Sequence, residues 1–321
     1  MQDGTDTETV SGWARWPSWR PTSMSLLKST EAKLLACIQN ELWARFVTLP
    51  TQDRIWTLTV TNRHQPKVQK PVSKTPLVMI HGFGGGVGLW IRNLDPLSRS
   101  RPIIAFDLLG FGRSSRPRFP KDASLAEEKF VTSIEQVSHL ILADPWGFPE
   151  KPQPVADGTD DRRPKLPRWL KVTFSIVSLF NPLAVIRAAG PWGPGLVNRF
   201  RPDFKRKFED LFDDDTITQY IYHCNAQNPS GEVGFKAMSE SLGWAQRPML
   251  QRVHLLPPAL PVTLLYGARS WMDSSTGHRV AQLRPHSYSH TVVIEGASHH
   301  IYADQPEEFN RVVREICDSV D

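Results

Sequence analysis

Short, almost entirely apolar segments constrain the fold of this chain more than any other feature. Each is about the length of a strand, and glycine, aspartate or other polar residues follow it directly. A helical segment at residues 124–135 lies between two of them, and another at residues 306–320 closes the chain. Continuous apolar strands that alternate with helices are typical of a parallel sheet covered on both faces. We therefore expect a mostly parallel, doubly wound α/β sheet, with strands at residues 76–80, 102–107, 137–144, 261–266 and 291–295.

The stretch from residue 145 to about residue 258 has a different composition. It is rich in Pro, Trp, Phe and Arg, with helical patterns around residues 169–189 and 205–223. Such a stretch between two sheet strands predicts a helical cap or lid insertion. The predicted domains are thus a core of residues 23–149 and 256–321 and a cap of residues 150–255.

The N-terminal residues 1–22 form a Trp/Pro-rich arm with Trp13, Trp16 and Trp19. Tryptophan is favoured at a membrane–water interface, so the arm is either an interfacial anchor or a segment packed on its own domain. The next residues, 23–46, have the spacing of an amphipathic helix. Residues 44–50 and 54–60 are rich in β-branched and aromatic residues and predict a hairpin.

Composition narrows the class of protein. The chain has 321 residues, of which 40% are hydrophobic and 22% charged, and no apolar run approaches the roughly 20 residues that span a bilayer. Its first residues are polar, and its three cysteines are far apart, so a cytoplasmic protein is expected. The net charge of +5 favours anionic lipid surfaces, since no nucleic-acid module accompanies it. We expect no cofactor, no metal site and a peripheral location on membranes or lipid droplets.

The strongest local motif is the glycine-rich run at residues 81–86, directly after a predicted strand. Without Cβ atoms, such a loop can turn backbone N–H groups inward. Gly82, Phe83 and Gly84 are therefore candidates to bind an oxyanion. The alternatives are a plain strand-to-helix turn and a phosphate-binding loop. The glycine spacing does not fit a dinucleotide fingerprint.

A second motif lies near the C-terminus. Asp273 follows the strand at residues 261–266, and His299 follows the next strand. An acid and then a histidine after successive strands is the order of the last two members of a Ser…Asp…His triad. The acid would orient the imidazole, which would act as general base and then acid. His300 is a weaker substitute for His299.

Six segments of the chain resemble a known family. They are residues 81–90, 105–119, 142–149, 201–212, 220–232 and 299–310. They resemble the α/β-hydrolase branch that contains N-acylphosphatidylethanolamine lipase and the lipid-droplet coactivator of triglyceride lipase. This resemblance implies an α/β-hydrolase fold and removal of acyl chains from N-acyl phospholipids and lysophospholipids. It also implies an H-x-x-x-x-D motif, here His299 and Asp304, which has been discussed for lysophosphatidate acyltransfer.

One element of that family is missing. A serine hydrolase carries its nucleophile in G-x-S-x-G, and this motif occurs nowhere in the chain. The resemblance places it between the counterparts of Gln136 and Val137. Asp144 is a poor substitute, because the large Leu142 and Trp146 flank it two positions away. Ser114 and Ser115 lie in a loop beyond their strand and lack the second flanking glycine.

What is absent is one central β–α unit, roughly 25–35 residues by typical element lengths. The strand at residues 137–144 then either occupies the vacated place in the sheet or leaves a gap with unpaired backbone groups. A chain shortened in this way, as an alternatively spliced product would be, is expected to be marginally stable.

We therefore predict a lipid acyl hydrolase by family whose catalytic activity is lost in this chain. The alternative is a non-catalytic lipid-binding or lipase-regulatory protein. The expected partners are a lipid substrate, a membrane or lipid-droplet surface, or a lipase, and not nucleic acid.

Overall fold

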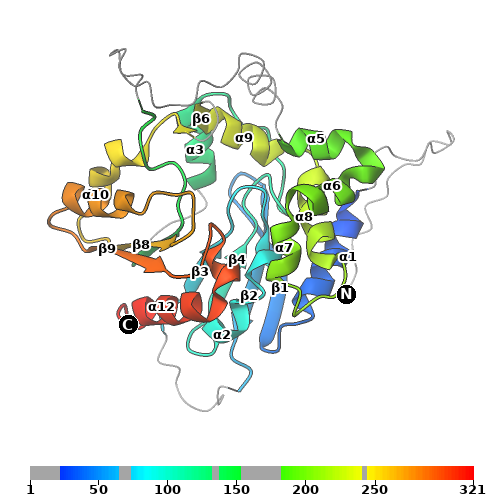
Figure 1. Cartoon of the computed structure of the whole chain (residues 1–321), viewed down its shortest axis with the longest axis horizontal. Helices are drawn as coiled ribbons and strands as arrows, with labels where there is room; N and C mark the ends of the chain where they lie inside the picture. The colour runs from blue at the N-terminus through cyan, green and yellow to red at the C-terminus, as the bar shows by residue number, and fades with distance from the viewer. Residues whose placement is uncertain (1–21, 65–73, 132–136, 153–181, 241–243) are drawn as a thin grey trace.

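The computed structural model describes residues 22–64, 74–131, 137–152, 182–240 and 244–321. Trp13, Trp16 and Trp19 lie outside these residues, as does most of the helix predicted at 169–189. Strands form the centre of the molecule, α12 packs along one side of them, and cap helices gather beyond the other side (Figure 1).

The first sheet has four strands in the order β1-β2-β4-β3. Strand β1 pairs antiparallel with β2, β2 antiparallel with β4, and β4 parallel with β3. The strands are β1 Glu41–Thr48, β2 Arg54–Thr61, β3 Leu77–Ile80 and β4 Ile103–Phe106.

The second sheet has three parallel strands in the order β5-β8-β9. They are β5 Leu140–Ala143, β8 Val262–Gly267 and β9 Ser289–Ile294. In the part of the chain that the structure describes, β3 and β5 have no strand between them and do not pair with each other. Of the two arrangements that the sequence left open, the structure has the gap.

The two sheets nevertheless share one hydrophobic core. Met79 of β3 and Leu265 of β8 belong to the same buried cluster, which Trp90 and Phe309 complete from the helical side. The helices around the sheets are α1 Met24–Leu35, α2 Leu94–Ser98, α3 Ala123–Val131, α10 Ser275–Leu283, α11 Ile301–Asp304 and α12 Pro306–Asp318.

Between β5 and β8 the chain forms a largely helical layer. Its helices are α5 Pro182–Ala188, α6 Gly193–Phe200, α7 Pro202–Lys207, α8 Thr216–Ala226 and α9 Ser230–Met238. A two-stranded ribbon of β6 Ser239–Glu240 and β7 Trp244–Ala245 follows. Short 3₁₀ turns lie at Val87–Trp90, Gly190–Trp192, Met249–Gln251 and Val253–Leu255. Within the described ranges, no helix is both long and apolar enough to cross a bilayer.

Two helices differ in extent from the sequence-based prediction. The helix expected at residues 23–46 ends at Leu35, because the Asp95 carboxylate accepts the N–H groups of Gln39 and Asn40 and directs the chain into β1. The segment expected at 205–223 is divided into α7 and α8. There the Asp214 carboxylate accepts the Thr216 N–H two residues on, in a turn that directly precedes α8.

Candidate functional site

The best-organised polar group in the molecule joins His299 to Asp144. His299 follows β9 and Asp144 directly follows β5, the two strands on either side of β8. Nδ1 of His299 lies 2.5 Å from Oδ2 of Asp144. The Asp144 side chain is fully buried, whereas 35% of the His299 side chain is exposed. The pair is thus an imidazole at the surface, held from beneath by a buried carboxylate.

Asp144 is held in turn by the loop after β8. Its carboxylate accepts the Gly267 N–H at 3.2 Å and the Ser270 hydroxyl at 2.5 Å. Its φ of 51° lies in the left-handed region, which aspartate tolerates better than most side chains. Such backbone strain at a buried, fully bonded carboxylate is typical of functional sites.

The chemistry available to this pair is proton transfer. With Nδ1 committed to Asp144, the imidazole presents Nε2 outward, and Nε2 has no hydrogen-bond partner in the described ranges. A carboxylate in this position fixes the ring and stabilises the imidazolium that forms when Nε2 takes a proton.

The acid that the sequence proposed, Asp273, lies elsewhere. It is exposed beyond β8, and its carboxylate accepts the N–H and the hydroxyl of Ser275 at 2.9 and 2.7 Å. The structure therefore brings His299 together with Asp144 and not with Asp273. Sequence reasoning considered Asp144 only as a nucleophile. Its signal was its place directly after a buried strand, upstream of the histidine.

Asp304 and His300 also have other partners than His299. Asp304 accepts the N–H of Ser298 at 2.9 Å and lies 3.0 Å from Nζ of Lys207. His300 hydrogen bonds Tyr302 at 3.1 Å, and burial together with neighbouring cations lowers its pKa to about 3. The His300 ring also contacts Phe204 of α7, with ring centroids 4.7 Å apart, so both residues hold the loop and the cap helix α7 against each other.

The glycine-rich loop after β3 is held by His81. The buried Nε2 of His81 accepts the Leu108 N–H at 3.1 Å, and Nδ1 donates to the Gly82 carbonyl at 2.7 Å. Burial lowers the His81 pKa to about 4, so the ring is neutral with its proton on Nδ1 at neutral pH.

The candidate oxyanion donors lie in the same loop. Gly84 has a φ of 69°, and its carbonyl accepts an amide N–H of Asn225 at 2.7 Å. The backbone N–H groups of Phe83 and Gly84 have no hydrogen-bond partner among the residues described. That is the state expected of donors kept for a ligand.

The loop after β3 and the loop after β5 meet at one aromatic side chain. Phe83 and Trp146 both contact Phe235 of α9, with ring centroids 4.4 and 4.8 Å from it. The carboxyl ends of the two sheets therefore lie on the same side of the molecule, beneath the cap.

The alternative serine nucleophiles do not reach this side. Ser114 accepts the Trp56 N–H at 2.9 Å and donates to the Asp107 carbonyl at 2.6 Å. Ser115 accepts the Arg54 N–H at 2.9 Å. Both hydroxyls thus fasten the loop after β4 to strand β2.

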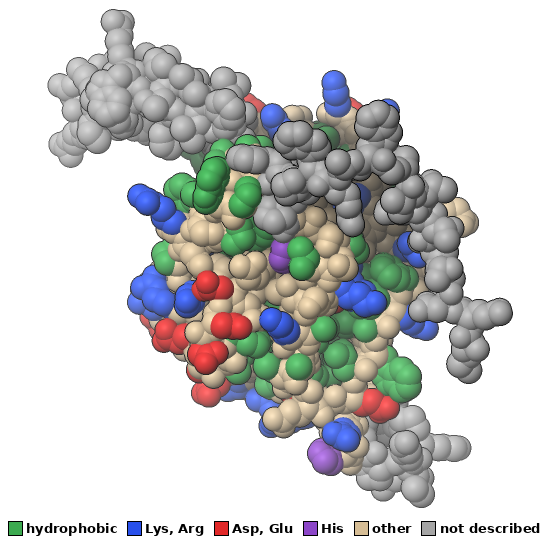
Figure 2. Space-filling view, turned by 90° about the vertical axis from the view of Figure 1, so that its right-hand side faces the viewer, with side chains coloured by type: hydrophobic (Ala, Val, Ile, Leu, Met, Phe, Trp, Pro, Cys, Tyr) green, Lys and Arg blue, Asp and Glu red, His purple; other side chains and the backbone are tan. Residues whose placement is uncertain are grey.

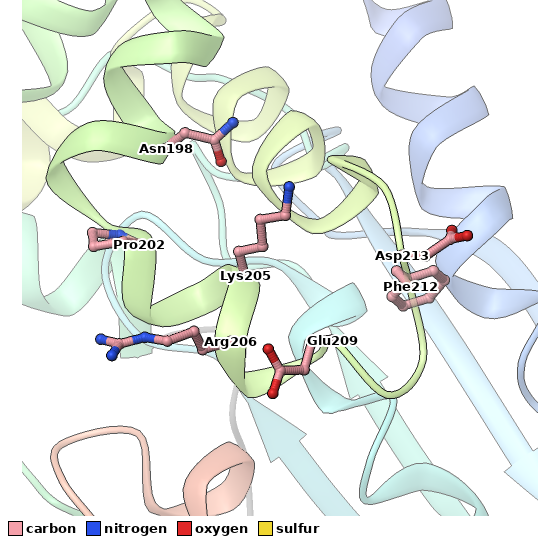
Figure 3. Close-up of a pocket in the computed structure, with 7 residues that line it drawn as sticks. All are labelled: Asn198, Pro202, Lys205, Arg206, Glu209, Phe212 and Asp213. Carbon is pink, nitrogen blue, oxygen red and sulfur yellow. The ribbon is translucent and has the colours of Figure 1, made fainter.

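One hollow belongs to the cap. It has a volume of about 460 Å³ and is lined by residues between Asn198 and Asp213, on α6, α7 and the turn that follows (Figure 3). Lys205 at its centre is paired with Asp215 at 2.9 Å. Neither His299 nor Asp144 lines it, so we do not assign it to the chemistry. Among the described residues, no three His, Cys, Asp or Glu side chains are placed to hold a metal ion.

The cap and α1 also present an apolar surface. Figure 2 shows hydrophobic side chains gathered on this face beside lysines and arginines. The exposed hydrophobic residues on these elements are Met24, Leu26, Val185, Trp192 and Phe200.

Solved structures with a similar arrangement of strands and helices support the fold described above. A membrane phospholipase A described as a bacterial virulence factor aligns with a TM-score of 0.55 and 20% identity, covering 92% of this chain and 91% of that one. Naproxen esterase from Bacillus subtilis aligns with a TM-score of 0.57 and 13% identity, covering 91% and 97%. These likenesses concern the fold alone.

Sequence comparison identifies relatives with much higher sequence identity. The profile of the α/β hydrolase fold matches residues 75–140. The (lyso)-N-acylphosphatidylethanolamine lipase of Bos taurus is 56% identical over 332 aligned positions, covering 94% of each chain. The human 1-acylglycerol-3-phosphate O-acyltransferase ABHD5 is 47% identical over 353 positions, covering 99% of this chain and 98% of that one. The chain therefore belongs to the α/β-hydrolase family, in the branch of (lyso)-N-acylphosphatidylethanolamine lipase and ABHD5.

Proposed function

We propose that this chain is a lipid-binding member of its family that does not hydrolyse acyl esters by itself. The observation that carries the proposal is the unpartnered Nε2 of His299, opposite which the described residues place no hydroxyl or thiol. An acyl transfer through a covalent intermediate needs such a nucleophile within hydrogen-bond reach of the base.

The lengths of the alignments support the proposal. Both the 332 positions aligned with the bovine lipase and the 353 aligned with human ABHD5 exceed the 321 residues of this chain. Each relative therefore has residues at positions where this chain has none. We infer that the strand, turn and helix of the nucleophile are among them.

The ligand we propose is of the N-acylphosphatidylethanolamine or lysophospholipid type, after the printed activity of the bovine relative. In this proposal residues 23–149 and 256–321 are the core and residues 150–255 the cap. The apolar face of the cap and the arm of Trp13, Trp16 and Trp19 would lie on a membrane or lipid-droplet surface.

Acyltransfer through His299 and Asp304 has less support. The Asp304 carboxylate is bonded to Ser298 and Lys207, so it does not orient the imidazole. A lipase partner on the exposed cap face remains compatible with the proposal.

Labelling with a fluorophosphonate probe tests the loss of the nucleophile. The folded protein should stay unlabelled under conditions in which the bovine lipase is labelled, with folding checked by circular dichroism. Labelling that disappears in His299→Ala would contradict the proposal, because it would reveal an activated serine.

Liposome co-sedimentation tests the proposed lipid surface. Replacing both Trp192 and Phe200, which are 69% and 64% exposed, with Ala should reduce binding several-fold, because both would lose contact with the interface. The same is expected for the triple replacement of Trp13, Trp16 and Trp19. Trp43→Ala is the matched control, since Trp43 is 63% exposed but lies on β1. Equal binding by all variants would refute the surface.

A further inference from the structure

The two sheets end in free edges that belong to β3 and β5. The Leu77 N–H donates to the Pro102 carbonyl, so Leu77 faces the β4 side of β3. Backbone groups of successive residues in a parallel strand point to opposite sides. Val78 and Ile80 therefore direct their N–H and C=O groups away from β4, where no described residue meets them.

Strand β5 has the same arrangement. The N–H groups of Leu140 and Asp144 donate to carbonyls on the β8 side, those of Pro261 and Leu265. Ile141 and Ala143 therefore direct their backbone groups away from β8, again without a described partner. Two rows of unpaired backbone groups are thus present, one from each sheet.

The two free edges lie next to each other. Ile141 and Ala143 of β5 pack against the buried cluster that contains Met79 of β3. Beyond the carboxyl ends, Phe83 and Trp146 both contact Phe235 of α9, with ring centroids 4.4 and 4.8 Å from it. The residues that follow β3 and β5 therefore meet at one side chain of the cap.

The described residues leave one face of this gap partly exposed. All six residues of β8 are buried, whereas 48% of Val78 is exposed and β5 is only half-buried along its length. Val78 lies on the same face of β3 as Ile80, which packs against the cluster under α3. A second helix beside α3 would bury Val78.

We propose that the slot between β3 and β5 is an acceptor site for one parallel strand supplied in trans. Its ligand is an extended apolar peptide, because Val78, Ile80, Ile141 and Ala143 carry no charge and offer backbone groups on both sides. This is recognition by strand addition, with two rows of main-chain hydrogen bonds where an ordinary sheet edge offers one.

The slot also connects to the site already described, and here the inference rests on the proposed function. A strand that runs parallel to β3 and β5 ends beneath Phe235, between the Phe83 loop and the loop of Asp144. A Gly-x-Ser-x-Gly turn at that end would bring a serine towards Nε2 of His299. The helix after the turn would cover Val78. The acceptor chain would thus contribute the base and the oxyanion donors, and the donor peptide the nucleophile.

A synthetic peptide tests the slot directly. The probe is the segment that the bovine lipase carries between its counterparts of Gln136 and Val137, with its serine replaced by Ala. We expect saturable binding in fluorescence anisotropy and slower hydrogen exchange, by at least about tenfold, at the amides of Val78, Ile80, Ile141 and Ala143. A scrambled peptide of the same composition should produce neither effect.

Two variants sharpen the test. Val78→Lys should weaken binding at least tenfold, because the donor helix would cover a charge. Val293→Lys, at a residue of similar exposure (44%) on β9, the far edge of the second sheet, should leave binding unchanged. Circular dichroism checks that both variants fold.

Three results would overturn the proposal. They are no binding, binding without protection of the four amides, or prior protection of these amides in a dimer detected by light scattering. The last would mean that a second copy of this chain already fills the slot.

The peptide with its serine intact separates this inference from the proposed function. In the complex, the serine oxygen should form a P–O bond with the fluorophosphonate as fluoride leaves, while its proton passes to Nε2 of His299. Labelling of the peptide that is lost in His299→Ala supports both proposals. Protected amides without labelling would support strand addition at the slot. They would contradict the proposal that the His299–Asp144 pair can activate an added serine.

Discussion

At the scale of single residues, the two candidate acids for His299, Asp144 and Asp273, differ in the hydrogen bonds that they accept. Asp144 accepts hydrogen bonds from three donors in two distant parts of the chain, the Gly267 N–H, the Ser270 hydroxyl and His299. Asp273 accepts only from Ser275, two residues away. Both acids follow strands and precede the histidine, so their order in the sequence could not separate them. The distinction comes from strand order, because β5 and β9 both flank β8.

Replacement with Ala should separate the two acids experimentally. Asp144→Ala leaves buried donors unsatisfied and should lower the free energy of unfolding by about 3 kcal/mol. Asp273→Ala should change it by less than about 0.5 kcal/mol, as is usual for exposed sites. Denaturant unfolding measures both, and equal effects would show that Asp144 is not the organising acid.

The buried His81 predicts a dependence of stability on pH. Its pKa is lowered from 6.5 to about 4 in the folded protein, so the unfolded chain takes up the proton first as pH falls. Its contribution is complete above pH 6.5 and is lost as pH falls towards 4, by up to about 3 kcal/mol. Compared with His81→Gln, the wild type should lose more free energy of unfolding across this window. Parallel pH curves would refute the assignment.

At the scale of elements, apolar runs predicted the parallel strands well. The strands predicted at residues 76–80, 102–107, 261–266 and 291–295 correspond to β3, β4, β8 and β9 within a few residues. The ends of helices were harder to predict, because side chains distant in the sequence determine where a helix ends. Asp95 ends the first helical segment from 55 residues away in the sequence, a contact that no local pattern contains.

A buried ion pair that no sequence pattern predicted joins two helices of the cap. Arg187 of α5 contacts the Glu232 carboxylate of α9 through both guanidinium nitrogens, at 2.6 and 2.8 Å. Glu232→Ala would leave a buried guanidinium without its partner, at a cost of about 3–5 kcal/mol. We expect faster proteolysis between residues 182 and 238 in this variant. The double replacement Arg187→Met and Glu232→Met should restore resistance, and its failure to do so would assign the effect to packing.

At the scale of the whole molecule, the break between β3 and β5 divides the strands into two sheets without disturbing the arrangement around it. The histidine, its acid and the glycine-rich loop each follow a strand, and the strands keep their directions because each sheet retains its own pairs. The sequence predicted such a break through an absent motif. It could not indicate whether β5 would move into the vacant place, since that depends on the pairing of β5 with β8 and on the packing of Phe148, Leu250 and Val253 against the residues of β5 and β8.

Filling the gap within the chain should therefore stabilise it. In a chimera, the segment of the bovine lipase is inserted between Gln136 and Val137. The insert would pair the backbone groups of Val78 and Ile141 and bury Val78. A midpoint of thermal unfolding at least about 5 °C higher is expected, because 1 kcal/mol corresponds to about 2–4 °C for a domain of this size.

A second chimera with the inserted serine replaced by Ala separates stability from chemistry. It should keep the whole increase in the midpoint and lose the fluorophosphonate labelling that the first chimera gains. An unchanged midpoint in both chimeras, measured by calorimetry, would mean that the edges of β3 and β5 are not held open for a strand. In that case the shortened sheet would be a complete structure, and the His299–Asp144 pair would serve a role that needs no added nucleophile.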